Sequence, residues 1–262
     1  MIYTVIDTET SGLSRENADV LSFSYALTNG KEILAADTLY FWTDGIQWNQ
    51  EAYETHKLSK EFLAQYKDDF DKNLRAMYSV IQDSILVGYN SGYMDKFGVL
   101  HGFDYQVIKN FLLRNMLDFP TPSSFVDLLK IVRSRETNAP NKKLQSMVDY
   151  YGISREDISR VNNTVFPGSI ATAHNSGYDV VCTVYMLKEM LAKNLIEVTT
   201  DFRKIVANDF QFVMVDGVMT AVYNDSVVYS FAEFVHEFPV IYTQIFGGIF
   251  NVWESNQYRR IE

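Results

Sequence analysis

Apolar residues in the first forty positions of the chain follow the pattern of β-strands. Residues 2–7 form a short apolar run rich in β-branched side chains, which is typical of a buried strand, and residues 20–27 and 31–40 follow as two more. Asn29 and Gly30 between the last two runs supply the residues that a tight hairpin turn prefers. The pattern therefore predicts three antiparallel strands at the start of the chain.

Helical periodicity dominates from residue 49 to residue 198, and short strands interrupt it. We predict helices at residues 49–82 (amphipathic from about residue 69), 95–101, 107–116, 128–132, 143–151 and 176–193. Short strands are predicted at residues 84–88 and 125–126. Gly152 follows the predicted helix 143–151 at the position where a glycine commonly ends a helix. This order predicts an α/β fold in which helices cover both faces of a mixed five-stranded sheet.

The pattern changes near residue 199, where strand-like segments return. Residues 210–215, 220–223 and 227–230 predict a meander with turns at residues 216–217 and 224–225. A short helix is predicted at 231–237, before Pro239, and strand-like sequence runs on through 247–253. We therefore interpret residues 1–198 as one domain and residues 200–262 as a small β-rich accessory region.

Composition narrows the classes of function. Hydrophobic residues make up 47% of the 262 residues, enough for a real core, and the single cysteine, Cys182, excludes a disulfide framework within the chain. No run of residues resembles a signal peptide or a membrane span, so we expect a cytoplasmic protein. The net charge of −10 argues against tight non-specific binding to duplexes, but an enzyme acting on a strand end needs only a short cationic groove.

Carboxylates stand at the end of the first predicted strand. Asp7 and Glu9 are two residues apart, so both side chains point to the same face of an extended strand. Such acidic pairs are often simply the start of an exposed loop, but here they end the most apolar strand. Paired hard oxygen ligands of this kind suit Mg²⁺ or Mn²⁺.

Three further residues complete the candidate chemistry. Asp95 and Asp179 each open a predicted helix, where an acid can equally serve as an N-terminal cap. His174 lies five residues before Asp179, on the preceding loop. Each residue has an ordinary structural explanation when taken alone, and only their combination points to catalysis.

In order and spacing these segments resemble the DnaQ-like (DEDDh) exonucleases of the ribonuclease-H-like superfamily. The resemblance covers residues 1–195 and rests on Asp7-Thr8-Glu9, on Gly88-Tyr89-Asn90 with Asp95, and on His174 with Asp179. Weaker matches are Ala52 to Leu58, which contains His56, and residues 125–129, 143–145 and 151–153. The sequence departs from the family where Lys57 replaces a glycine and where Met94, instead of an aromatic residue, precedes Asp95.

The resemblance implies 3′→5′ hydrolysis of phosphodiester bonds with two divalent ions. It assigns Asp7, Glu9 and Asp179 to one ion, Asp7 and Asp95 to the other, and His174 to the role of general base. It also assigns three substrate contacts, namely Thr10 near the 3′-hydroxyl, Leu13 as a wedge between the last two bases, and Asn90 as an orienting residue. Each of these three could equally be an ordinary loop residue.

Two other functions remain open at this stage. The same fold could be a non-catalytic module that binds a nucleic-acid end or a partner protein, or a proofreading-type subunit docked on a polymerase or another replication or repair protein. The substrate is expected to be a nucleic-acid 3′ end, with single-stranded DNA favoured over RNA. The basic residues 130, 133, 135, 142 and 143 could contact phosphates, although such clusters are more often solvated helix faces.

Overall fold

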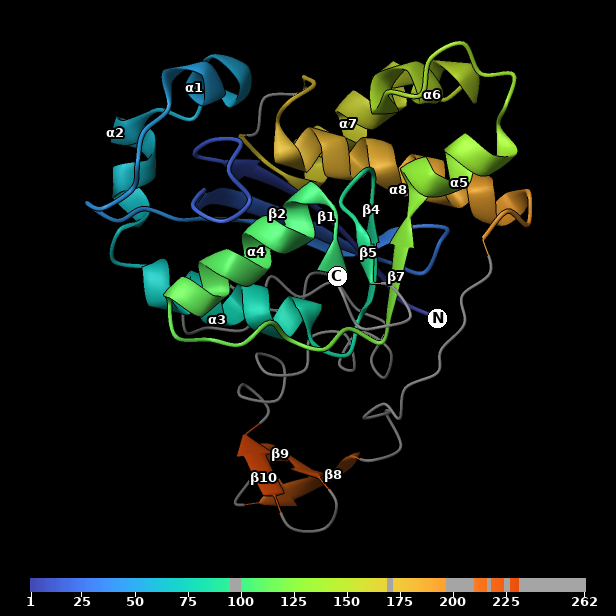
Figure 1. The fold of residues 1–262 in the computed structure, drawn as a ribbon. Helices are drawn as coiled ribbons and strands as arrows, with labels where there is room; N and C mark the ends of the chain where they lie inside the picture. The colour runs from blue at the N-terminus through green and yellow to red at the C-terminus, as the bar shows by residue number, and fades with distance from the viewer. Residues whose placement is uncertain (95–99, 169–171, 197–209, 216–217, 224–226, 231–262) are drawn as a thin grey trace.

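A mixed five-stranded sheet forms the centre of the structure, a computed structural model that describes residues 1–94, 100–168, 172–196, 210–215, 218–223 and 227–230. Its strands are β1 (Tyr3–Thr10), β2 (Val20–Thr28), β3 (Ile33–Tyr40), β4 (Ile85–Gly88) and β7 (Ser124–Asp127). They lie in the order β3-β2-β1-β4-β7 (Figure 1). The first three are antiparallel neighbours, whereas β4 is parallel to β1 and β7 is parallel to β4. The predicted sheet is confirmed.

Helices cover both faces of this sheet, as predicted (Figure 1). One face carries α3 (Phe70–Ile81) and α4 (Phe103–Arg114), and the other carries α5 (Leu128–Arg135), α6 (Leu144–Tyr150), α7 (Arg155–Val165) and α8 (Ser176–Ala192). Shorter helices α1 (Gln50–His56), α2 (Lys60–Leu63) and η1 (Ala64–Tyr66) connect β3 to α3. The sequence pattern did not predict α7, whose exposed face is strongly polar.

Two apolar clusters, one on each face, hold the layers together. Ile6 and Phe23 point from β1 and β2 toward α3 and α4, while Val5 and Ala26 point toward α8. Both clusters contain side chains with no exposed surface, so the sheet is buried on both sides. Alternate residues of β1 therefore face different helical layers, and Asp7 and Glu9 share the face of Val5, toward α8.

The segment after β4 differs from the prediction. A helix was expected over residues 95–101, but Leu100–His101 is a short strand, β6, paired with β5 (Tyr93–Met94). Gly92 and Gly102 adopt φ values of 126° and 101° at the base of this hairpin. A Cβ atom on Gly92 would lie 1.8 Å from the carbonyl oxygen of His101, so only glycine permits this close approach. The rest of the expected helix, residues 95–99, lies outside the described residues.

A second sheet forms from the later strands. Strands β8 (Phe210–Val215), β9 (Val218–Tyr223) and β10 (Val227–Ser230) pair in the order β10-β9-β8, both pairs antiparallel, which is the predicted meander. The helix and strand expected over 231–237 and 247–253 lie outside the described residues. The division into two domains stays a prediction.

No helix in the described part of the chain has both the length and the apolar character that a membrane span requires.

Candidate active site

Strand β1 carries the first two carboxylates of the site. Asp7 pairs in register with Ser24 of β2, and Glu9 pairs with Ser22. Strand β1 is the central strand, but its pairing with β4 covers only Tyr3 to Val5, so Asp7 and Glu9 lie beyond that pairing on the face toward α8. Both are half-buried, so they are partly removed from water yet remain accessible.

A third carboxylate comes from the opposite helical layer. Asp104 lies in the first turn of α4, and its Oδ1 accepts a hydrogen bond of 2.9 Å from the hydroxyl of Thr8. Thr8 stands between Asp7 and Glu9, so this bond ties the start of α4 to the acidic end of β1. Asp104 is close enough to raise the pKa of both Asp7 and Glu9.

Asp104 was not predicted from the sequence, because the motif spacing points to Asp95, which lies outside the described residues. The signal that could have found it is the preceding residue. Phe103 is the aromatic neighbour that the resemblance calls for, whereas Met94 precedes Asp95. The hairpin β5–β6 lies between Asn90 and Asp104 and lengthens the spacing beyond that of the common motif.

Asp179 supplies the fourth carboxylate, from the first turn of α8. Its Oδ2 accepts a hydrogen bond of 2.9 Å from the backbone N–H of His174, and its Oδ1 accepts one of 2.9 Å from Nε2 of Gln145. His174 is exposed and has a left-handed backbone with φ of 63°. The structure therefore places His174 beside Asp179, as the sequence predicted.

Gln145 is itself fixed by a hydrogen-bonded network that the sequence did not reveal. Arg155 donates from Nη1 to the side-chain oxygen of Gln145 at 3.0 Å and from Nη2 to its backbone carbonyl at 3.0 Å. The same guanidinium forms two hydrogen bonds with the carboxylate of Asp149, at 2.8 and 2.9 Å. Because both ends of Gln145 are held, its amide N–H group is directed at Asp179.

The four carboxylates repel one another strongly. Burial raises the pKa of Asp7 well above its usual range, and Asp104, Asp179 and Glu9 raise it further. Burial is also the main cause that raises the pKa of Glu9 well above its usual range and that of Asp104 and Asp179 to about 6. No lysine or arginine among the described residues forms an ion pair with any of the four.

Such a donor set fits divalent cations. Carboxylates that are partly desolvated and lack a basic partner are costly to keep ionised, and a hard cation removes that cost. As they stand, no three acidic, histidine or cysteine side chains in the described residues converge closely enough to enclose an ion. Ion binding would therefore have to draw the carboxylates together from positions in which they already act on one another.

The three predicted substrate contacts differ in whether their side chains are exposed. Leu13 is 88% exposed on the loop after β1, an unusual position for a large apolar side chain. Asn90 is also exposed, with φ of 69°, whereas Thr10 is buried and donates its hydroxyl to the carbonyl of Gly12 at 2.9 Å. The side chain of Thr10 thus has the turn role that was its alternative interpretation.

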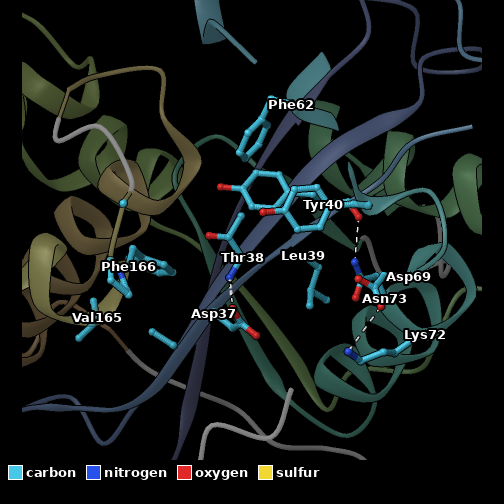
Figure 2. Close-up of a pocket in the computed structure, with 14 residues that line it drawn as sticks. Asp37, Thr38, Leu39, Tyr40, Phe62, Asp69, Lys72, Asn73, Val165 and Phe166 are labelled. Carbon is cyan, nitrogen blue, oxygen red and sulfur yellow. Dashed lines mark hydrogen bonds and ion pairs between the residues drawn. The ribbon is translucent and has the colours of Figure 1, made fainter. Parts of the chain in front are cut away.

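A hollow of about 430 Å³ lies at the edge of the sheet, beside β3 (Figure 2). Tyr40, Phe62 and Tyr66 gather on one side of it, with ring centroids of Tyr40 at 4.9 and 4.7 Å from the other two, and Phe166 lines the opposite side.

Between this hollow and β1, the start of α8 lies against β2. The hydroxyl of Ser176 shares hydrogen bonds with Ser22 at 2.9 Å and with Ser24 at 2.8 Å. These bonds fasten the N-terminal turn of α8, which carries Asp179, to β2.

Comparisons with known proteins agree with this architecture. The model of the exonuclease family RNase_T matches residues 4–157, which is more than half of the chain. No curated protein sequence matches. Among solved structures, *E. coli* exonuclease I in complex with a dT13 oligonucleotide has a TM-score of 0.53 and 17% identity over 72% of this chain and 40% of that one.

Two further structures are similar to the same degree. The zinc-bound complex of *E. coli* exonuclease I with single-stranded DNA gives a TM-score of 0.55 and 18% identity, over 74% of this chain and 42% of that one. Exonuclease I from *Methylocaldum szegediense* gives 0.54 and 16%, over 73% and 40%. The chain spans about two fifths of the length of these proteins, and such low identity supports the fold alone. The family model, by contrast, matches the sequence itself over more than half of its length, and the chain belongs to the RNase_T exonuclease family.

Proposed function

We propose that this chain is a 3′→5′ exonuclease that hydrolyses phosphodiester bonds at the 3′ end of nucleic acid, with single-stranded DNA as its preferred substrate. The observation that carries the proposal is the group of four carboxylates, Asp7, Glu9, Asp104 and Asp179, which two helical layers and the central strand bring together without a basic partner. The oligonucleotides bound to *E. coli* exonuclease I support the choice of substrate.

The carboxylates would hold two divalent ions, Mg²⁺ or Mn²⁺. Asp7, Glu9 and Asp179 would hold one, and Asp7 with Asp104 the other, so Asp104 takes the role that the resemblance gave to Asp95. Bound ions would polarise the scissile phosphodiester and stabilise the charge that develops during displacement. Gln145 keeps the carboxylate of Asp179 in one orientation while this happens.

His174 would accept a proton from the attacking water at an imidazole nitrogen. Its exposed position next to Asp179 leaves the ring accessible to the reacting group. Exposed Leu13, on the loop that follows Glu9, would insert beside the terminal base.

The test is degradation of oligonucleotides labelled at the 3′ or the 5′ end, as DNA and as RNA, with Mg²⁺, with Mn²⁺ and with EDTA. We expect shortening from the 3′ end that EDTA abolishes and that His174→Ala reduces at least about 100-fold. Asp104→Asn should abolish it, whereas Asp95→Asn, the matched control, should leave most of it.

Other outcomes would revise or reject the proposal. Loss of activity in Asp95→Asn but not in Asp104→Asn would restore the sequence-based assignment of the fourth carboxylate. Folded protein that binds oligonucleotides but cleaves none, with either metal, would instead support the non-catalytic binding module. The polymerase partner remains a prediction that no feature of the site favours.

A further inference from the structure

A second hollow, of about 310 Å³, lies at the carboxyl ends of the parallel strands β4 and β7. Its lining includes Asn90, Gly92, Tyr93, Gly102, Lys130 and Arg133. Gly102 comes two residues before Asp104, so the hollow adjoins the carboxylate site through the start of α4. The carboxyl edge of parallel strands is where α/β sheets commonly bind ligands.

The hairpin β5–β6 forms one wall of this hollow. Tyr93 and His101 are paired across the hairpin, and their rings stack with centroids 4.9 Å apart and planes inclined by 24°. The ammonium of Lys130 lies 3.8 Å from the centroid of the Tyr93 ring, a close cation–π contact. An otherwise mobile lysine side chain is therefore held at one place in the wall.

Positive charge is concentrated here in a chain that is acidic as a whole. Lys130 and Arg133 are three residues apart on α5, so they lie one above the other on the same helix face. Both are exposed, and neither forms an ion pair with a carboxylate among the described residues. Their charges are therefore available to a ligand.

One carboxylate, that of Asp127, also lines the hollow, but backbone groups occupy it. It accepts hydrogen bonds from the N–H groups of Asn90 at 3.1 Å and Gly92 at 3.2 Å, and from those of Leu129 at 2.9 Å and Lys130 at 3.4 Å. These bonds fasten the loop after β4 to the start of α5. Asp127 thus keeps the walls in place, while Lys130 and Arg133 set the charge of the opening.

We infer that this hollow is a phosphate subsite, in which Lys130 and Arg133 bind a backbone phosphodiester of the substrate strand upstream of the bond to be cleaved. The inference rests on the proposed function and extends it from the scissile bond to the adjacent strand. Asn90 would donate to the same strand from its exposed amide. A chain with net charge −10 repels nucleic acid at long range, so local cationic contacts decide how tightly the strand is held.

The test is the steady-state kinetics of strand degradation by the full chain with Mg²⁺, using oligothymidylates and a series of salt concentrations. Lys130→Gln and Arg133→Gln should each raise KM roughly tenfold at low salt, with little change in kcat, because the contact is made in the ground state and the transition state alike. Each should also reduce the slope of log(kcat/KM) against log salt by about 0.7, the value for one phosphate of a single strand.

Matched controls exist for both variants. Lys193 lies 4.0 Å from the ring centroid of Tyr151 but lines neither hollow, and Arg75 is exposed on α3 and likewise lines neither. Lys193→Gln and Arg75→Gln remove the same charges and should leave KM and the salt slope unchanged. If they reproduce the effects of Lys130→Gln and Arg133→Gln, general charge and not a subsite is responsible, and the inference fails.

Two small ligands test this inference independently of the proposed function. The p-nitrophenyl ester of thymidine 5′-phosphate has no upstream phosphate, so wild type and both variants should hydrolyse it equally. No hydrolysis of strands or ester by the wild type would reject the proposed function itself. Inhibition by thymidine 5′-phosphate distinguishes the two sources of phosphate: if both variants weaken it as much as they raise KM, the hollow binds the released product and the upstream assignment is wrong.

Discussion

The clearest quantitative prediction concerns His56, the last residue of α1. Its side chain belongs to one of the segments that resemble the exonuclease family, yet the structure gives it a structural role. The residue is only 6% exposed, Nδ1 accepts the backbone N–H of Leu58 at 2.9 Å, and Nε2 has no hydrogen-bond partner among the described residues. Burial, followed by the charge of Lys57, lowers the pKa of His56 from 6.5 to about 4.

This shift makes the free energy of unfolding depend on pH. The folded chain binds the proton less readily than the unfolded chain, so the contribution of His56 is fully present above pH 6.5 and is lost as pH falls toward 4. A pKa shift of this size changes the free energy of unfolding by about 3 kcal/mol once His56 is fully protonated in both states. Between pH 7 and pH 5 the expected loss of stability is about 2 kcal/mol.

Urea unfolding of wild type and His56→Asn at pH 7, 6 and 5 measures this effect. Asparagine can place its side-chain oxygen near the position of Nδ1 and so keep the bond to Leu58, but it does not titrate. Carboxylates add the same pH dependence to both proteins, so the difference between the two curves isolates His56. Wild type should lose about 2 kcal/mol more than the variant between pH 7 and 5. Parallel curves would show that the imidazole is not held neutral by burial, and the reasoning would be refuted.

Three further predictions concern residues around the site. Gln145→Leu removes the hydrogen bond to Asp179, so we expect kcat/KM to fall about 10- to 100-fold and the Mg²⁺ concentration for half-maximal activity to rise. Gln145→Glu should not restore activity, because a carboxylate cannot donate this hydrogen bond. Lys57→Gly should stabilise the fold by about 0.5–1 kcal/mol in urea unfolding, because Lys57 has a left-handed backbone with φ of 61°. Gly92→Ala should destabilise the chain by on the order of 1–3 kcal/mol and reduce nuclease activity, since its Cβ would collide with the carbonyl of His101; an unchanged melting temperature would contradict the close approach.

The fold was largely predictable because its strands carry strong local signals. The apolar runs of β1 and β2 have residues buried on both faces, and the turn at Asn29 and Gly30 fixes the antiparallel pairing of β2 with β3. Both signals, the apolar runs and the turn residues, come from residues that are close to one another in the sequence. Helix α7 escaped prediction because only a few of its residues are buried, among them Ile158 and Asn162, so its pattern reads as a polar loop.

The site was predictable only in part, for a related reason. Asp7, Glu9, His174 and Asp179 stand at fixed distances from a strand end or a helix start, and motif spacing finds them. Motif spacing does not find Asp104, because a hairpin separates it from β4. Its position is set by the hydrogen bond with Thr8, which is 96 residues away in the sequence. The hydrogen bond from Gln145 to Asp179 is likewise a long-range contact that no local pattern encodes.

The close contact at the base of the β5–β6 hairpin has a consequence for how such an enzyme can change. The two glycines at 92 and 102 lie against one another, and the N–H of Tyr105 donates to the carbonyl of Ser91 at 3.3 Å, so the chain leaves and re-enters the domain at almost the same point. Whatever lies between them can be replaced or lengthened while β4 and Asp104 keep their places. Grafting a different hairpin should therefore change one wall of the second hollow and leave Asp7, Glu9, Asp104 and Asp179 in place.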